Sequence, residues 1–386
     1  MSILSNEYFV LGNVVYSKKM NRGFVMSQDI IERLIQAEKT NQLDVFSDKE
    51  KRFLLEKGLL VESNEKNNIV CLETDMNECR LFIQLTNKCN LRCKHCFVES
   101  NMKERDFFTY ESTIELIDCA VKNGINRIDF TGGEVFTQSF FMDVLKYLEH
   151  QPVGYSFFSN LTISTEKTLW ELTKLKGLIC IITSLDYFDE NRHNQFRGSN
   201  TAFQTTLKNI QWLKEHGVKV IVNIMVMDDN HDDVERMTEF FRKNEIEVHF
   251  DTVIDCGRAK CNTFKNQNAD NNIQFVKKML FRLQTQGVMV NHLVGSCGVS
   301  KTLIFSHYTG EFMLCPGLTK DIDDKYAFGF DIKDAWKKSK KLNVGCSQKE
   351  CEKWKQCSYG CRLRALVDNG SDVAPDSMMC YLMRGI

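Results

Sequence analysis

Three cysteines within eight positions form the most distinctive group of potential ligands in the sequence. They are Cys89, Cys93 and Cys96 in TNKCNLRCKHCF, with the spacing C-x3-C-x2-C. Such tight spacing lets one loop wrap around a compact inorganic centre. A structural zinc ion would require four protein ligands, whereas three thiolates on a four-iron cluster leave one iron open for an exchangeable molecule. We therefore expect an open iron–sulfur cluster here, with zinc as the alternative.

The overall composition fits a globular protein of two or three domains. The chain has 386 residues, 43% of them apolar and 26% charged, with a net charge of −1. This balance gives no general attraction to nucleic acid or anionic membranes. No apolar run approaches the roughly 20 residues of a spanning helix. The first residues, MSILSNEYF, have no basic stretch before an apolar core, so we do not expect a secretory signal. We expect a cytoplasmic protein, in which 16 cysteines favour metal or cluster ligation over disulfides.

From about residue 80, strand-like segments alternate with amphipathic helical segments. The alternation predicts parallel β/α units, and right-handed crossovers would curl them into an open or partial barrel. Active sites of such folds lie at the carboxyl ends of the strands. The cysteine triad directly follows the first expected strand. The six expected strands are RLFIQLT, RIDFT, YSFFS, GLICIITSLD, VKVIVNIMV and VHFDTVID.

The cysteine spacing, placed directly after the first strand, resembles the signature of radical S-adenosylmethionine (SAM) enzymes. The resemblance implies that the open iron chelates the methionine moiety of SAM, and that an electron from the cluster releases a 5′-deoxyadenosyl radical. Gly132, Gly133 and Glu134 end the second strand and match the family's GGE motif for the methionine amino group. His95 takes a position that often packs near the adenine, although it can also face solvent.

Polar residues also end the later strands. Ser159 and Asn160 follow the third strand, Ser184 and Asp186 the fourth, and Asn223 lies on the fifth. Each alone is commonly a loop or cap residue. The resemblance implies that Ser159, Ser184 and Asn223 contact the cofactor.

Two arginines follow expected strands. Arg197 can clamp the methionine carboxylate, as arginine does in other proteins, or form a surface salt bridge. Arg258, in DTVIDCGRAKC after the sixth strand, sits where it can face substrate.

Seven cysteines mark the last hundred residues. The segment KTLIFSHYTGEFMLCP predicts a hairpin that turns at Thr309–Gly310. The cysteine pattern resembles the SPASM domain, except that four residues rather than two separate Cys346 from Cys351. The resemblance implies two auxiliary four-iron clusters, with two structural zinc sites as the alternative. One cluster would be held by Cys346, Cys351, Cys357 and Cys380, and the other by Cys297, Cys315 and Cys361, with a fourth position either open or filled by Cys256, Cys261 or another upstream cysteine.

The first 75 residues predict a strand–helix–helix–strand unit of winged-helix size. Ahead of a radical SAM core, such a unit resembles the recognition element of peptide-maturation enzymes. The resemblance implies that the leader of a precursor peptide adds as an edge strand along EYFVLGNVVY. The alternatives are a DNA-reading winged helix, for which KEKRFLLEKG offers no convincing basic face, and a structural cap.

Together these features predict an α/β protein with a partial (β/α)6 TIM-like barrel at residues 76–285. A winged-helix-like α+β domain (1–75) precedes it, and a cysteine-rich SPASM domain (286–386) follows. The expected function is a radical SAM peptide maturase with three [4Fe-4S] clusters, which takes a hydrogen atom from a ribosomal precursor peptide and forms a carbon–carbon, ether or thioether crosslink.

The expected partners are the precursor peptide with its leader and an external one-electron reductant such as flavodoxin or ferredoxin, with no nucleic acid and no membrane. Three alternatives remain open. They are formylglycine formation on a sulfatase-type protein, peptide epimerisation, and a non-catalytic iron–sulfur or zinc protein.

Overall fold

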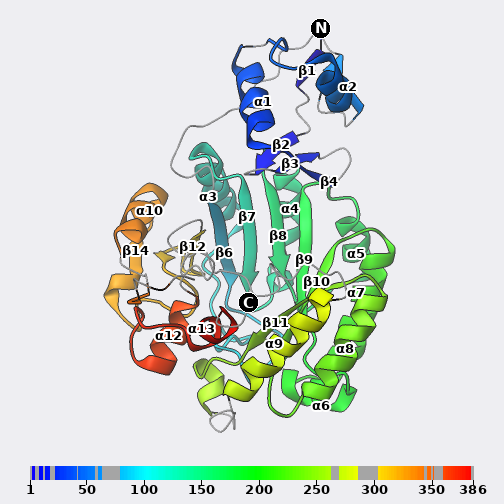
Figure 1. The fold of residues 1–386 in the computed structure, drawn as a ribbon. Coiled ribbons are helices and arrows are strands. Elements are labelled where there is room, and N and C mark those ends of the chain that lie inside the picture. The colour runs from blue at the N-terminus through cyan, green and yellow to red at the C-terminus, as the bar shows by residue number, and fades with distance from the viewer. Residues whose placement is uncertain are drawn as a thin grey trace.

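The protein is described by a computed structural model, whose fold is drawn in Figure 1. The structure describes residues 2–4, 8–11, 14–17, 22–40, 42–56, 60–62, 79–261, 269–285, 303–342, 346–348, 351 and 360–383. Cys297 and Cys357, two of the expected auxiliary ligands, lie outside these residues. No helix in the described ranges is both long and apolar enough to cross a bilayer.

A parallel sheet forms the centre of the molecule and confirms the predicted α/β fold. Its six parallel strands lie side by side in chain order, each joined to the next through a helical crossover. They are β6 (Arg80–Thr86), β7 (Arg127–Gly132), β8 (Gly154–Phe158), β9 (Leu178–Ser184), β10 (Val220–Val226) and β11 (Glu247–Thr252). The helices between and after them are α3 (Tyr110–Lys122), α4 (Phe141–Leu148), α5 (Glu166–Leu172), α6 (Glu190–Arg197), α7 (Ala202–Glu215), α8 (His231–Lys243) and α9 (Ala269–Thr285).

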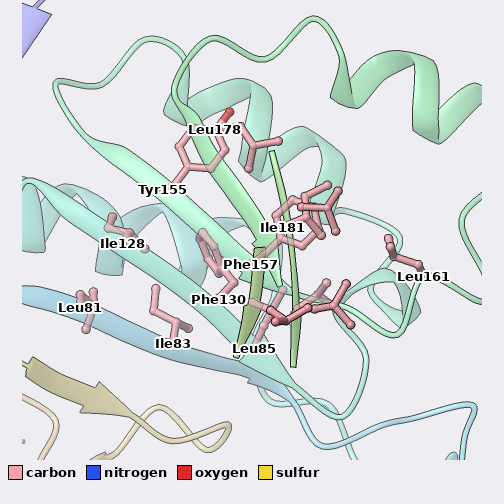
Figure 2. Close-up of a cluster of buried hydrophobic side chains, with 14 of the residues drawn as sticks. Leu81, Ile83, Leu85, Ile128, Phe130, Tyr155, Phe157, Leu161, Leu178 and Ile181 are labelled. Atoms are coloured by element: carbon pink, nitrogen blue, oxygen red, sulfur yellow. The ribbon is translucent and has the colours of Figure 1, made fainter. Parts of the chain in front are cut away.

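One face of this sheet carries the hydrophobic core. Side chains of a strand alternate between its two faces, and here every second residue is fully buried beneath the helices (Figure 2). The intervening residues therefore point to the opposite face. The core residues of the first three strands are Leu81, Ile83 and Leu85 of β6, Ile128 and Phe130 of β7, and Tyr155 and Phe157 of β8.

Helix α6 is the one crossover element that the sequence pattern did not predict. Its sequence, ENRHNQFR, has too few apolar residues to give a helical period. Instead the Asp189 side chain caps its start by accepting a hydrogen bond from the Arg192 backbone N–H, and the left-handed Gly198 ends it. The helix matters for the site because it carries Phe196 and Arg197 to the cysteine loop.

The predicted carboxyl-terminal hairpin is present, and it extends the central sheet. Strand β12 (Leu303–Ser306) pairs antiparallel with β13 (Phe312–Met313), as expected from the turn at Thr309–Gly310. The sequence pattern does not predict that β12 also pairs in parallel with β6 or that β14 (Ala327–Gly329) pairs with β13. With them the sheet has nine strands within the described residues. Helices α10 (Ile332–Lys341), α12 (Arg362–Asn369) and α13 (Ser377–Met383) follow.

The amino-terminal unit contains two small antiparallel sheets and two helices. Strands β2 (Tyr8–Leu11), β3 (Val14–Ser17) and β4 (Arg22–Val25) form one sheet with β3 in the middle. The second half of EYFVLGNVVY is therefore not an edge, and among the described strands of that segment only β2 has an open side. The other elements are β1 (Ser2–Leu4), its partner β5 (Leu60–Glu62), α1 (Gln28–Thr40) and α2 (Asp48–Glu56). In Figure 1 this unit lies beyond the end at which the central strands begin.

Candidate active site at the cysteine loop

The cysteine loop, residues 87–100, follows β6 at the carboxyl edge of the sheet. Cys89 is buried, and Cys93 and Cys96 are partly buried. Burial is the main cause that raises the pKa of the Cys89 thiol to about 12, and the nearby Cys93, Glu134 and Cys96 add to it. Within the described ranges, no three His, Cys, Asp or Glu side chains are arranged to hold a single metal ion.

The donors around two of these sulfurs suit an iron–sulfur cluster. The Leu91 backbone N–H donates to Cys89 Sγ (3.4 Å), and Arg197 Nη1 donates to Cys93 Sγ (3.6 Å). Hydrogen bonds to thiolate sulfurs are among the means by which proteins stabilise and tune such clusters. Three thiols on one loop, with N–H groups directed at them, thus fit a cluster that lacks a fourth protein ligand.

The GGE turn packs directly against the cysteine loop. A Cβ atom at Gly133 would lie 2.2 Å from Lys88 O and 2.8 Å from Cys89 Cβ, so only glycine fits there. The backbone N–H of Gly133 donates to Thr86 O, and that of Glu134 donates to Lys88 O. The position of the first cysteine is therefore coupled to the turn at the end of β7.

Glu134 is a buried carboxylate that joins the carboxyl ends of β7 and β8. Its Oε1 accepts from Ser159 Oγ (2.8 Å) and the Phe136 N–H (3.2 Å), and its Oε2 accepts from the Asn160 N–H (2.7 Å). Burial raises its pKa to about 7 despite these donors. The structure thus brings together Glu134 and Ser159, two of the residues that the sequence analysis selected.

Arg197 lies inside the protein. Its side chain is 9% exposed, and its Nη2 forms a 2.5 Å ion pair with Oδ2 of Asp186, whose side chain is 1% exposed. This observation contradicts the surface salt bridge considered from sequence. Although burial lowers the pKa of Arg197, the charges of Asp186 and Cys93 raise it above the usual value. The Nε atom is buried and has no hydrogen-bond partner in the described ranges, so it is available to a ligand.

His95 packs against α6. Its imidazole stacks on the Phe196 ring with 4.7 Å between centroids and 5° between planes. Burial, together with the charges of Arg197 and Arg258, lowers its pKa well below the usual value, so the ring is neutral. Its Nδ1 is buried without a hydrogen-bond partner in the part of the chain that the structure describes. The ring therefore packs on α6, and the residue as a whole is partly buried.

Ser184 and Asn223 lie in one row across the sheet. Ser184 is the register partner of Asn223, and Asn223 is in turn the register partner of His249 on β11. Asn223 Oδ1 is buried and has no hydrogen-bond partner among the described residues. Its free oxygen can accept a hydrogen bond from a ligand hydroxyl. Sequence reasoning missed His249 because the strand pattern alone does not reveal its neighbours across the sheet.

Arg258 lies elsewhere than the sequence predicted, and Asp106 was not predicted as a site residue. Arg258, expected to face substrate, instead directs its guanidinium to carbonyl groups of the cysteine loop. Asp106 accepts hydrogen bonds from Thr86 Oγ1 (3.0 Å) and Gln138 Nε2 (2.6 Å) and pairs with Lys88. It therefore ties the loop after β6 to the turn after β7, and no local sequence signal marks it.

The structure places five of the seven expected auxiliary cysteines. Cys361 caps α12, and its Sγ accepts from the Arg364 N–H (3.5 Å). Cys315 Sγ accepts from the Leu318 N–H (3.2 Å), and both cysteines pack against the main core. Cys346 and Cys380 are partly buried, whereas Cys351 is exposed. The described residues do not bring them into a closed ligand set.

The fold and site together define an α/β protein whose strand ends surround an open triad of thiols. Residues 83–241 match the family model of the radical SAM superfamily. This part of the chain is therefore a radical SAM domain. A radical SAM domain implies SAM and one four-iron cluster as cofactors.

Two curated relatives differ in how much of this chain and of their own length the alignment covers. The antilisterial bacteriocin subtilosin biosynthesis protein AlbA of Bacillus subtilis is 27% identical over 195 residues, which cover 50% of this chain and 44% of AlbA. The chain thus spans less than half of that relative. The AdoMet-dependent heme synthase of Nitratidesulfovibrio vulgaris is 25% identical over 356 residues, which cover 81% of this chain and 95% of the synthase.

Among solved structures, Streptococcus suis SuiB bound to its precursor peptide SuiA superimposes with a TM-score of 0.67. The superposition covers 98% of this chain and 100% of that one, at 14% sequence identity. At this identity the likeness establishes the fold. It supports the partial-barrel arrangement of the parallel sheet.

Proposed function

We propose that the protein is a radical SAM peptide maturase. The observation that carries the proposal is the convergence, at one edge of the sheet, of the cysteine loop, the Glu134–Ser159 pair and the buried Arg197. When bound, the cluster and SAM supply a one-electron cleavage that yields a 5′-deoxyadenosyl radical. Cys89, Cys93 and Cys96 would hold the cluster and leave one iron to the methionine moiety.

The residues around the triad can bind the parts of SAM. The Gly132–Gly133–Glu134 turn offers a carboxylate, already held by three donors, to the methionine ammonium. Arg197 offers its unpartnered Nε to the methionine carboxylate. Ser184 and the free Oδ1 of Asn223 suit ribose hydroxyls, and the neutral His95 suits the adenine.

A peptide substrate is supported by the amino-terminal sheet and by the comparisons. Among the strands that the structure describes, β2 has an open side along which a leader can add. AlbA acts in bacteriocin biosynthesis, and SuiB binds a precursor peptide. We assign residues 1–75 to leader recognition, 76–285 to the radical SAM barrel and 286–386 to a SPASM domain. The product would be a carbon–carbon, ether or thioether crosslink.

The carboxyl-terminal cysteines would hold two auxiliary clusters that accept the electron released when the new bond forms. By the SPASM resemblance, Cys346, Cys351, Cys357 and Cys380 hold one, and Cys297, Cys315 and Cys361 hold the other. An external donor such as flavodoxin or ferredoxin would reduce the triad's cluster.

A second candidate is an activity on a tetrapyrrole. The heme synthase alignment favours it, because that alignment extends over most of both chains. Formylglycine formation and peptide epimerisation remain alternatives that use the same radical. The substrate that is consumed and the mass change of the product together distinguish these activities.

The test is anaerobic reconstitution followed by incubation with SAM, dithionite and the peptide encoded by an adjacent gene. We expect about twelve irons per chain, 5′-deoxyadenosine, and a peptide that has lost two hydrogens. A peptide of unchanged mass with an inverted residue would identify an epimerase. Absence of 5′-deoxyadenosine, with zinc in place of iron on the triad, would overturn the proposal.

A further inference from the structure

The turn after β11 contacts the cysteine loop from the far edge of the parallel sheet. The contact is made by the 3-10 helix η2 (Gly257–Cys261), whose first residue, Gly257, has a φ of +55°. A Cβ atom there would lie 2.4 Å from Phe97 O and 2.6 Å from Cys96 O. Glycine is thus required both by the backbone conformation and by the close approach.

Arg258, the next residue, makes three hydrogen bonds to the cysteine loop. Its backbone N–H donates to Cys96 O (3.0 Å), its Nε to Cys93 O (2.9 Å) and its Nη1 to Ser100 O (2.8 Å). One guanidinium therefore bridges two carbonyls that lie seven residues apart in the chain. Strands β6 and β11 do not pair with each other, so these bonds link the loop of the first barrel strand to the end of the last.

Two arginines contact Cys93 at different atoms. Arg197 donates to the sulfur of Cys93, whereas Arg258 donates to the carbonyl of the same residue. Both guanidinium charges also act on His95, which lies between Cys93 and Cys96 in the chain. The second half of the triad is consequently held from two sides, by α6 and by η2.

We propose that Arg258 is a positioning residue, which fixes Cys93 and Cys96 in the arrangement that the open cluster requires. This inference deepens the proposed role of the triad and rests on it. The planar guanidinium presents several N–H donors in a fixed fork, which the single ammonium of lysine cannot reproduce. Shape as well as charge is therefore needed at this position.

The test compares the variants R258Q and R258K with the control variant R242Q. Arg242 is an exposed arginine of α8 that pairs with Glu239. Hydrogen exchange is followed by mass spectrometry on the full chain, before and after anaerobic reconstitution. We expect exchange of the amides in 93–100 to rise about tenfold in both Arg258 variants, while amides of β8 keep the wild-type rate. R242Q should match the wild type throughout.

A second measurement addresses the cofactor. SAM is titrated into the reduced protein while the electron paramagnetic resonance signal of the triad's cluster is recorded. We expect both Arg258 variants to need about tenfold more SAM for the same spectral change. Unchanged exchange in 93–100, an equal rise in β8, or full rescue by lysine would each overturn the proposal. The wild type's own production of 5′-deoxyadenosine tests the enzyme assignment separately.

Discussion

Ser159 Oγ lies 2.8 Å from Glu134 Oε1, and this hydrogen bond joins the carboxyl ends of β8 and β7. Both residues are buried, Glu134 almost completely. A buried carboxylate is stable only when donors replace the water that it has lost. Ser159 is one of three such donors, so it stabilises the site before any ligand arrives.

Replacing this donor should cost stability in the unliganded protein. We expect S159A to lower the free energy of unfolding by about 1–3 kcal/mol, because one carboxylate oxygen loses a buried partner. Urea denaturation measures the change. S164A is the matched control, since Ser164 Oγ is also buried but has no hydrogen-bond partner in the described ranges. Equal losses in the two variants would show that the Ser159–Glu134 bond contributes nothing specific.

Breaking the Asp186–Arg197 pair should lower the free energy of unfolding far more than breaking an ion pair on the surface. D186N leaves a buried guanidinium without its counter-charge, which we expect to cost about 3–5 kcal/mol. E171Q, which breaks the largely exposed pair between Lys174 and Glu171, should cost less than about 1 kcal/mol. The same urea measurement applies to both. A small loss in D186N would mean that solvent reaches Arg197.

His193 should make the protein less stable in acid. Burial and then the charge of Arg197 lower its pKa to about 3, from 6.5, and its Nδ1 accepts a hydrogen bond from the Asp186 N–H (3.2 Å). Between these two pH values the unfolded chain binds a proton that the folded protein excludes. Stability therefore falls as the pH drops below about 6.5, by up to about 1.4 kcal/mol per unit.

The variant H193N tests this assignment, because Asn Oδ1 can accept the Asp186 hydrogen bond but does not titrate. Unfolding free energies at pH 5, 6 and 7 should decline less steeply in H193N than in the wild type. Some decline will persist, since burial also lowers the pKa of His307 to about 4. Parallel pH profiles for the two proteins would refute the role of His193.

The sequence predicted elements and strand-end residues better than it predicted contacts. The six parallel strands followed from their apolar runs, and the carboxyl edge of the sheet then placed Glu134 and Ser159 near the cysteine loop. The Arg258 contact spans 158 positions or more, and no local pattern encodes such pairings. Helix α6 was missed because its stability comes from caps and burial rather than from an apolar stripe.

The open side of β2 yields a prediction about the proposed leader peptide. In an antiparallel ladder, neighbouring residues direct their N–H groups alternately toward the partner strand and away from it. Phe9 is the register partner of Tyr16, and Val10 that of Val15. Of the variants F9P and V10P, one therefore removes a bond to β3, and the other removes an outward N–H that a leader strand could use.

We expect the outward proline to weaken binding of a fluorescently labelled leader peptide about tenfold or more, while circular dichroism remains that of the wild type. The inward proline should instead disturb the sheet itself. G23P and F24P, on the other edge strand β4, serve as the comparison, since one of the two removes an outward N–H of that strand. If only the outward proline of β4 weakens binding, the leader pairs with β4, and the assignment of β2 as the docking edge is wrong.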